Sequence, residues 1–408
     1  MLVQDIWCHI HSLLPIQESA RAASVSRVFL RSWRSRPNLI LTKETLCLKQ
    51  NTCGEGDTAR ALAENIDQIL KTHSGTGVKT LELDVFDCHV YSFPCSLLFG
   101  QNGISIQDFH LTRCAFHPTA GILRNLTNLY LSYVCITGEE LGCLLSNSLA
   151  LMELKLEYCN EIVSLKIPCM LEQLSCLTVS DCSMLQTIES QAPNLTTLDF
   201  TGDNLVQLSL GQPLQMKNLL MECLEENLLC YAIANLPYKV PNLETLTLSS
   251  DSERVNTPMV PAKFLHLEYL EIIFNGDSSP GYDYLSLLSF LDASPVLETF
   301  VLRVSHFFGT TSHLRQMPEH KHDNLKDVSI FGFCSAKSMV ELTCHIVECC
   351  ATSARKTGAC WPLTNEVILE AHRGLMAIKT YILGKVPSTV ELDVRKPCSH
   401  CHALTGHS

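Results

Sequence analysis

Three residues near the end of the chain have types and spacing that could do chemistry. Cys398, Cys401 and His402 form the pattern C-x-x-C-H, which serves for covalent haem attachment in exported proteins. Thiolates and imidazoles also bind zinc. A structural zinc site has four ligands, however, and this segment supplies three, with His402 or His407 as the histidine. We therefore predict no metal and no cofactor at this segment.

No other pattern in the sequence indicates catalysis. The Gly-rich phosphate loop, the G-x-S-x-G turn of hydrolases and the H-E-x-x-H zinc motif do not occur. The 16 histidines and 21 cysteines are scattered, so no Cys–His nucleophile pair stands out. We predict a non-catalytic protein without catalytic residues.

Composition and charge narrow the class of protein. Of the 408 residues, 46% are hydrophobic and 18% are charged, so the chain can bury a large core and is not mainly disordered. The formal net charge is −12, from 42 acidic and 30 basic residues. Because proteins that coat DNA or RNA need a basic face, we expect no nucleic-acid partner.

The N-terminal stretch MLVQDIWCHIHSLL does not have the pattern of a signal peptide. Asp5 and two histidines interrupt its apolar residues, and no basic residue precedes them. No stretch approaches the roughly 18 uninterrupted apolar residues of a membrane helix. We therefore expect reduced cysteines, no membrane partner, and a location in the cytoplasm, the nucleus or both.

An internal repeat organises most of the chain. The template apolar-x-x-apolar-x-apolar occurs eleven times, from Val78-Leu81-Leu83 to Leu325-Val328-Ile330, with start-to-start spacings of 20 to 30 residues. The alternation in each copy predicts a strand with one buried face, and the period is near that of leucine-rich repeats. This pattern accounts for most of the excess of leucine, which supplies 64 residues.

The residue types at one fixed position of the turn give independent evidence for the repeat. Three residues after the last apolar residue of the template, seven of the eleven copies carry a small polar residue or Cys: Cys114, Cys159, Cys182, Asp203, Asp251, Asn275 and Ser305. Such side chains can bond backbone groups that leave a strand. The alternative, a leucine-rich all-α chain with chance matches, would not produce this agreement.

The strand residues that point away from the core are predicted to line a concave partner-binding surface. They mix charged, hydroxyl and aromatic side chains: Glu82, Asp84, His110, Thr112, Tyr130, Ser132, Lys155, Glu157, Thr178, Ser180, Asp199 and Thr201. Between the strands, apolar spacing predicts helices at 57–70, 138–146 and 282–292 and an extra short strand at 162–167.

Two apolar stripes at helical spacing precede the repeats. The first lies in residues 4–14 and ends at Pro15, and the second runs from Val25 to Trp33 and ends at Pro37, with a short Ala-rich segment between them. Three such short helices bury little area by themselves, so we expect a partner or the adjoining domain to stabilise them. The stretch SLLPIQESARAASVSRVFLRSW in this segment resembles the F-box of grass F-box/leucine-rich-repeat proteins.

The F-box resemblance implies that these helices bind a Skp-type adaptor of a cullin–RING ubiquitin ligase. Carried over by position, the residues that face the adaptor or support that face are Leu13, Leu14, Pro15, Ile16, Val25 and Trp33. The family usually opens with Leu-Pro-x-Asp, whereas Leu2 is followed here by Val3. Periodicity alone also allows three core helices of an ordinary α-domain.

The C-terminal region carries a second resemblance. The stretch HKHDNLKDVSIFGFCSAKSMVELTCHIVE resembles the FBD-related terminal region of plant F-box repeat proteins, and the stretch that begins VILEAHRGLMAIKTYILGK resembles the closing segment of the grass proteins. Amphipathic helices are predicted at 339–346 and 367–382, and together they would cover the open end of the repeats. Residues 354–361 interrupt the pattern where the family has a Leu-x-x-Leu-x-Leu strand.

These observations predict an α/β solenoid: a small three-helix F-box, a leucine-rich-repeat horseshoe and a C-terminal cap. The expected divisions are an F-box at 1–41, a linker and a helix at 42–77, repeats at 78–333 and an FBD-related cap at 334–408. The predicted function is the substrate-recognition subunit of a Skp–cullin–F-box ubiquitin ligase, with the adaptor–cullin complex and a target protein as partners. The alternative is a non-ubiquitinating leucine-rich-repeat scaffold with a degenerate F-box, which Val3 and the interruption at 354–361 favour.

Overall fold

The computed structural model describes residues 6, 9–10, 13–34, 36–42, 44–46, 55–73, 77–85, 91–95, 105–118, 123–211, 215–224, 227–275, 282–305, 314–315, 322, 324–349, 365–388 and 390–394. The chain forms two compact units. The first is Met1–Gly202 with Val206–Gln215, and the second is Asp203–Leu205 with Met216–Ser408. The C-x-x-C-H segment and residues 354–361 lie outside the described residues.

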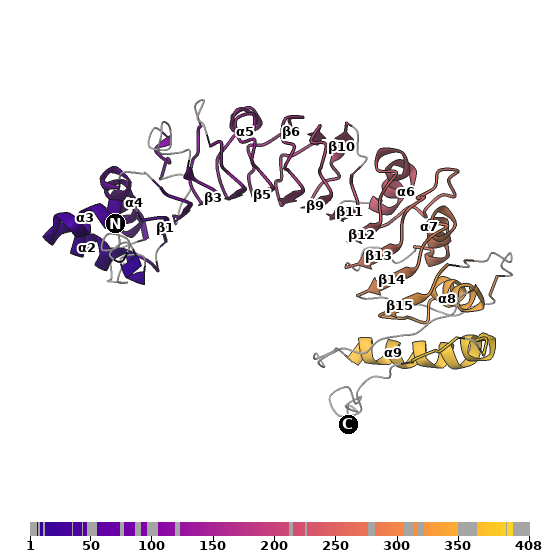
Figure 1. The fold of residues 1–408 in the computed structure, drawn as a ribbon. Helices are drawn as coiled ribbons and strands as arrows, with labels where there is room; N and C mark the ends of the chain where they lie inside the picture. Colours follow the sequence, from indigo (N-terminus) through magenta and orange to yellow (C-terminus); the bar gives the residue numbers. More distant parts are fainter. Residues whose placement is uncertain are drawn as a thin grey trace, which may run out of the picture. The chain divides into compact units, whose positions relative to one another are not determined.

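A parallel sheet runs through the first unit (Figure 1). Its strands follow the order of the chain: β1 Asn38–Leu41, β2 Thr80–Asp84, β3 Asp108–Thr112, β4 Asn128–Ser132, β5 Glu153–Glu157, β7 Cys176–Ser180 and β9 Thr197–Gly202. Strands β2 to β9 of this sheet coincide with predicted repeats, so the periodicity is confirmed here. Strand β1 precedes the first predicted repeat and pairs with β2, so the sheet begins earlier than the template indicated.

Neighbouring strands pair so that the same template position recurs on each strand. Leu81 pairs with Phe109, and Phe109 pairs with Leu129, which places apolar side chains in a continuous column. All three are at most 2% exposed. Burial of one such side chain contributes about 1.5–3 kcal/mol, and because each repeat covers its neighbour, the repeats stabilise one another.

On the side away from this sheet, the first unit carries a helix and three short strands. Helix α5 (Gly138–Leu145) begins with a capping box, in which the Thr137 hydroxyl accepts a hydrogen bond from the Glu140 N–H and the Glu140 carboxylate accepts one from the Thr137 N–H. Strands β6 (Ser164–Ile167), β8 (Thr187–Ser190) and β10 (Gln207–Leu210) form a parallel three-stranded sheet. Figure 1 shows α5, β6 and β10 opposite β3, β5 and β9. The predicted strand at 162–167 is thus confirmed and is one of three.

Helices α2 Ile16–Val25, α3 Arg27–Arg34 and α4 Glu55–Thr72 lie before or between the first strands of the described part of the chain. Pro15 directly precedes α2, where its fixed φ of −53° fits a helix start. Helix α4 begins two residues before its predicted start and buries Leu62, Ile66 and Leu70. The predicted helix at 4–14 lies mostly outside the described residues.

The second unit continues the repeat with five parallel strands. They are β11 Asn218–Cys223, β12 Thr245–Ser250, β13 Tyr269–Phe274, β14 Thr299–Val304 and β15 Asp327–Phe331. Its helices are α6 Leu228–Lys239, η3 Tyr284–Leu287, α7 Leu288–Ala293, α8 Lys337–Cys349 and α9 Asn365–Ala377, and the helical turns η4 Ile378–Ile382 and η5 Leu383–Lys385 follow α9. The stacked parallel strands make a solenoid-like α/β fold, as predicted.

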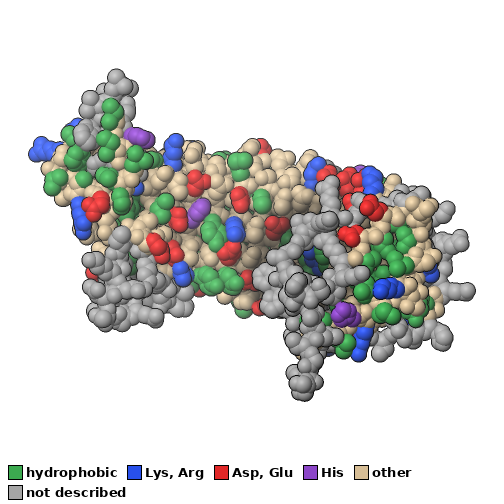
Figure 2. All heavy atoms as spheres, turned by 90° about the horizontal axis from the view of Figure 1, so that it is seen from below, with side chains coloured by type: hydrophobic (Ala, Val, Ile, Leu, Met, Phe, Trp, Pro, Cys, Tyr) green, Lys and Arg blue, Asp and Glu red, His purple; other side chains and the backbone are tan. Residues whose placement is uncertain are grey.

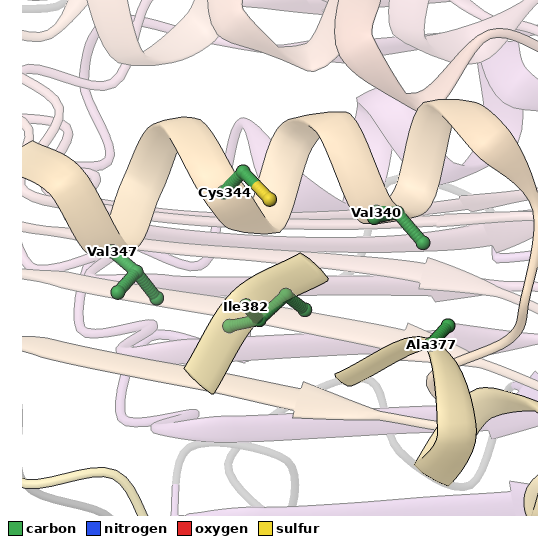
Figure 3. Packing of buried hydrophobic residues seen from close by; sticks show 5 residues of the cluster. All are labelled: Val340, Cys344, Val347, Ala377 and Ile382. Atoms are coloured by element: carbon green, nitrogen blue, oxygen red, sulfur yellow. The ribbon is translucent and has the colours of Figure 1, made fainter. Parts of the chain in front are cut away.

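Two helices share an apolar core at the C-terminal end of the second unit. Figure 3 shows Val340, Cys344 and Val347 of α8 facing Ala377 of α9 and Ile382 of η4. All five are at most 5% exposed. Both predicted amphipathic helices therefore form and pack on each other, whereas their role in covering the open end of the repeats stays a prediction.

A buried carboxylate also joins α9 to the start of α8. Glu370 of α9 accepts hydrogen bonds from the backbone N–H and the hydroxyl of Ser335, at 2.8 and 2.7 Å. Ser335 lies just before α8, where backbone N–H groups have no partner inside the helix. None of the described helices combines the length and the apolar character needed to span a bilayer.

Candidate functional site

The residues predicted to face an adaptor lie in or next to α2 and α3 and differ in exposure. The exposed members are Leu13, Pro15 and Val25, and the less exposed ones are Leu14, Ile16 and Trp33. Leu13 and Val25 are 72% and 79% exposed, whereas Ile16 and Trp33 are at most 4% exposed. The exposed apolar residues are available to a partner, and the two buried ones can only support the helices from inside.

Arg36 connects these helices to the start of the sheet. Its guanidinium donates hydrogen bonds to the Ser19 hydroxyl at 2.9 Å, to the Leu14 carbonyl at 3.0 Å and to the first carbonyl of β1 at 3.1 Å. The Trp33 ring meets the His73 ring edge-on at 6.1 Å. Burial lowers the pKa of His73 to about 4, so this imidazole is neutral at pH 7.

The twelve predicted partner-binding residues form two rows on the sheet of the first unit, which we call the exposed strand face. By strand register, one row is Glu82, His110, Tyr130, Lys155, Thr178 and Asp199, and the other is Asp84, Thr112, Ser132, Glu157, Ser180 and Thr201. All except Ser132 are partly exposed. Figure 2 shows one side of the molecule, on which hydrophobic, acidic and basic side chains are interspersed. The strand register aligns the twelve residues in these rows, and their role in binding stays a prediction.

A network of polar side chains connects the middle strands of this face. Tyr130 donates a hydrogen bond to the Glu157 carboxylate, and the Lys155 ammonium lies 2.7 Å from the same carboxylate. Lys155 also lies 4.9 Å from the centroid of the Tyr130 ring, and the His110 ring meets that ring edge-on at 5.7 Å. Strands β3, β4 and β5 position these groups because adjacent strands lie about 4.8 Å apart.

The electrostatics of this network favour the charged pair. Burial raises the pKa of the Glu157 carboxyl, but hydrogen bonds from Lys155 and Tyr130 outweigh burial and place it below the ordinary value. The hydrogen bond to Glu157 raises the pKa of Lys155, and burial with the Glu157 hydrogen bond raises that of Tyr130. At pH 7 the network holds one cation, one anion and a neutral phenol, which suits recognition through hydrogen bonds and ion pairs.

Next to these rows lies a third set of side chains, which the sequence reasoning missed. Arg113, Tyr133, Tyr158 and Asp181 each directly follow a strand, at the edge where the carboxyl ends of the parallel strands meet, and we call them the carboxyl-edge row. Their φ angles are 51° to 58°, in the left-handed region that non-glycine residues seldom adopt. Each donates its backbone N–H to a carbonyl of the next strand, at 2.7 to 2.9 Å.

Arg113 of the carboxyl-edge row forms a two-pronged ion pair with Asp84. The Arg113 Nη2 atom lies 2.7 Å and 2.9 Å from the two carboxylate oxygens, and its Nε lies 3.1 Å from one of them. Such paired hydrogen bonds fix the orientation of both groups. Asp84 was predicted as a partner-binding residue, but in this structure its carboxylate is already neutralised.

Two of the predicted turn positions, Cys159 and Cys182, bond backbone carbonyls, whereas Asn275 bonds the side chains of Glu222 and Ser249. Cys159 donates its thiol to the Leu131 and Glu157 carbonyls at 3.5 Å, and Cys182 donates to the Ser180 carbonyl at 3.6 Å. Cys114 and Cys159 are fully buried, and Cys182 is 7% exposed. These thiols therefore belong to the turns of the repeat.

The outward face of the second unit carries a similar network. Glu271 accepts a hydrogen bond from Tyr269 at 2.9 Å and pairs with Arg303 at 2.5 Å, and the Arg303 guanidinium lies 4.3 Å from the centroid of the Phe331 ring. Burial and the hydrogen bond to Glu271 raise the pKa of Tyr269 to about 12. These residues occupy outward strand positions of the template, so the register that selected residues in the first unit could have found them.

The described residues contain no group of three or more His, Cys, Asp or Glu side chains placed to hold a metal. The predicted absence of catalytic residues is not tested by this geometry. The C-x-x-C-H segment lies outside the described residues.

Comparison with known proteins identifies the repeats. The family model described as At1g61320/AtMIF1, LRR domain, matches residues 88–399, about three quarters of the 408 residues. The comparison with curated proteins gave no match.

Proposed function

Because the chain belongs to the At1g61320/AtMIF1 family of plant leucine-rich-repeat proteins, we propose that it is a non-catalytic receptor that binds a partner protein. The observation that supports this role most directly is the exposed strand face, where polar and aromatic side chains stand in register on parallel strands. Rigid strands hold such groups in fixed positions, which reduces the entropy lost on binding.

We further propose that the receptor is the substrate-recognition subunit of a Skp–cullin–F-box ubiquitin ligase. The support is the F-box-like segment, whose helices present Leu13, Val25 and Val28 to solvent at exposures of 72%, 79% and 43%. Exposed apolar side chains that lie close in sequence are typical of an interaction site. The same segment is joined to the sheet through Arg36, so an adaptor bound to the helices is fixed relative to β1.

In this proposal the protein acts by proximity. The adaptor connects the receptor to the cullin and the charged conjugating enzyme, while the strand face holds the target protein. Tethering a lysine of the target near the conjugating enzyme raises its effective concentration without chemistry by the receptor. Such a protein would act in the cytoplasm or nucleus, where its cysteines stay reduced.

The test is retention of the full chain by an immobilised Skp-type adaptor. Val25→Asp places a charge on the exposed helix surface and should weaken retention at least tenfold, which corresponds to about 1.4 kcal/mol. Val163→Asp is the matched control, because Val163 is 44% exposed and lies in the repeats just before β6. Equal retention of the two variants, or no retention of the wild-type chain while a known F-box protein binds, would remove the ligase proposal.

The second candidate is a leucine-rich-repeat scaffold with a degenerate F-box. It is favoured by Val3, which stands where the F-box family has proline. A scaffold of this kind would bind partners through its strands without binding the adaptor. Capture of the same partners by wild-type and Val25→Asp chains, with no adaptor in either complex, would support it.

A further inference from the structure

Two tyrosines of the carboxyl-edge row form an exposed aromatic pair. The rings of Tyr133 and Tyr158 are stacked, with centroids 4.3 Å apart and an angle of 9° between their planes. The residues are 46% and 38% exposed. Aromatic side chains of this size are usually covered in the folded protein, so a stacked pair in solvent offers ring surface to a partner.

The backbone and a neighbouring carboxylate fix this pair in place. Tyr133 and Tyr158 donate their N–H groups to the Glu157 and Ser180 carbonyls, at 2.8 and 2.9 Å, from left-handed backbone with φ of 53° and 51°. The neighbouring Asp181 carboxylate raises the pKa of Tyr158 to about 12. Because the pair is already ordered, little further entropy is lost when a partner binds.

The surface around the pair is strongly acidic. On the outward positions of β2, β3, β4, β5, β7 and β9 and on the carboxyl-edge row, seven carboxylates accompany two side chains that are always cationic. The carboxylates are Glu82, Asp84, Asp108, Glu153, Glu157, Asp181 and Asp199, and the cations are Arg113 and Lys155. Both cations are engaged in ion pairs, with Asp84 and Glu157 respectively.

The other five carboxylates of this surface form no ion pair with a Lys or Arg side chain among the described residues. They are Glu82, Asp108, Glu153, Asp181 and Asp199. Asp181 follows the strand next to Tyr158, whose N–H bonds the Ser180 carbonyl, and its charge acts on the Tyr158 phenol. A partner that brings positive charge would be attracted to this surface and would relieve the repulsion between its carboxylates.

We propose that Tyr133, Tyr158 and Asp181 form a docking platform for an arginine-rich segment of the partner protein. This inference rests on the proposed receptor function and specifies the chemistry of what the receptor holds. A guanidinium stacks on a tyrosine ring through its planar face and donates hydrogen bonds to a carboxylate through its edge. The platform offers both groups side by side.

The same geometry disfavours nucleic acid as the occupant. Single-stranded nucleic acid also stacks on aromatic rings, but its binding requires a basic groove that follows the phosphates. Here the two cations of the surface are already paired, and the remaining charges are negative. Phosphates would therefore be repelled from the surface that attracts guanidinium groups.

The test measures binding of fluorescent peptides to the full chain. The probes are a Gly-Ser peptide with four arginines, the same peptide with four lysines, and the same peptide with four glutamines. We expect the arginine peptide to bind most tightly and the glutamine peptide not to bind. Tyr158→Ala should weaken arginine-peptide binding about threefold to fivefold, as should Asp181→Asn, and added salt should weaken it further. Tyr158→Phe keeps the stacked ring and should retain most of the affinity.

Tyr238→Ala is the matched control, because Tyr238 is a 70% exposed tyrosine on α6 of the second unit. The platform would be overturned if Tyr238→Ala and Tyr158→Ala lost the same affinity for the arginine peptide. It would also be overturned if the arginine and glutamine peptides bound equally, or if a short oligothymidylate bound more tightly than the arginine peptide. Circular dichroism of each variant shows whether it is folded.

Adaptor retention, measured on the same preparations, separates the two proposals. It depends on the helices around Val25 and not on the tyrosine pair. If the wild-type chain binds the adaptor but not the arginine peptide, the platform alone is rejected. If it binds the arginine peptide but not the adaptor, the ligase role alone is rejected.

Discussion

Glu253 provides a sharp test of how the second unit is stabilised. Its side chain is 1% exposed, and its Oε1 atom accepts a 2.9 Å hydrogen bond from the Leu229 N–H in the first turn of α6. Burial raises the pKa of this carboxyl from the ordinary value of 4.5 to about 7, although hydrogen bonds from the backbone of α6 act in the opposite direction. Glu253→Gln keeps the size and the accepting oxygen but removes the charge.

The direction of the pH effect follows from the raised pKa. The unfolded chain releases this proton near pH 4.5 and the folded protein keeps it until about pH 7, so the free energy of unfolding falls as pH rises through this interval and levels off above it. At 1.36 kcal/mol per pKa unit, the loss is about 3 kcal/mol. We expect Glu253→Gln to match the wild type near pH 4.5 and to be roughly 2–3 kcal/mol more stable above pH 7.

The neighbours of Glu253 do not obscure this effect. Burial raises the pKa of both Cys230 and Tyr282 above their ordinary values of 9.0 and 10.0, so neither titrates in the interval. Other groups of the acidic chain change stability with pH, but they do so in both proteins and cancel in the difference.

The assay is urea unfolding followed by circular dichroism between about pH 5 and about pH 8, for the wild type, Glu253→Gln and Glu268→Gln. Glu268 is an exposed carboxylate in the same unit, so its variant should follow the wild type at every pH. Hydrogen exchange of peptides from α6 locates the change. A difference between the wild type and Glu253→Gln that stays constant within about 0.5 kcal/mol over the whole range would refute the reasoning.

Three further substitutions test local packing. A Cβ on Gly332, at φ 70°, would overlap a backbone carbonyl of β14, so Gly332→Ala should lower stability by about 2–4 kcal/mol in thermal unfolding, whereas Gly142→Ala, with open space around it, should not. Glu370→Ala leaves the buried N–H and hydroxyl of Ser335 without their acceptor, and should cost about 2–3 kcal/mol and speed hydrogen exchange in α8 and α9. Thr137→Ala removes the capping box of α5 and should lower stability by about 1 kcal/mol in urea unfolding. Equal effects of the two glycine variants would contradict the first prediction. Unchanged hydrogen exchange in Glu370→Ala would contradict the second, and an unchanged urea midpoint in Thr137→Ala would contradict the third.

The repeat strands could be predicted because their constraints are local. Leu246 and Leu248 alternate with polar residues, and the same alternation recurs at Leu270 and Ile272, so the pattern indicates both the strand and its buried face. Each strand pairs with the next copy of the template, and the register follows directly. The outward strand positions of the exposed strand face follow from the same alternation, and their role in binding stays a prediction.

Elements that depend on tertiary context were missed. Strand β1 has only four residues, so it carries too little of the template to be seen. Helix α6 contains Pro237, which predicts a helix end, but burial of Leu229, Ile233 and Leu236 stabilises the helix around it. The F-box and FBD resemblances stay predictions, since helical spacing alone does not distinguish an F-box from other small helical domains.

The carboxyl-edge row was missed although its members share one position of the template, two residues after its last apolar residue. Its side-chain directions depend on a left-handed backbone, and Arg113, Tyr133 and Tyr158 are residue types that rarely adopt it. Only the structure shows that consecutive repeats place these residues on one edge, where Tyr133 and Tyr158 stack.

The left-handed backbone of the carboxyl-edge row lowers the stability of the fold but presents side chains that a partner could bind. An L-residue with this backbone costs about 1–2 kcal/mol relative to glycine, so glycine at Tyr133 or Tyr158 would relax the backbone. The same change would erase the ring surface on which the proposed platform depends. A redesign that optimised folding alone would choose glycine at these positions, and the more thermostable protein that resulted would offer a partner no aromatic ring there.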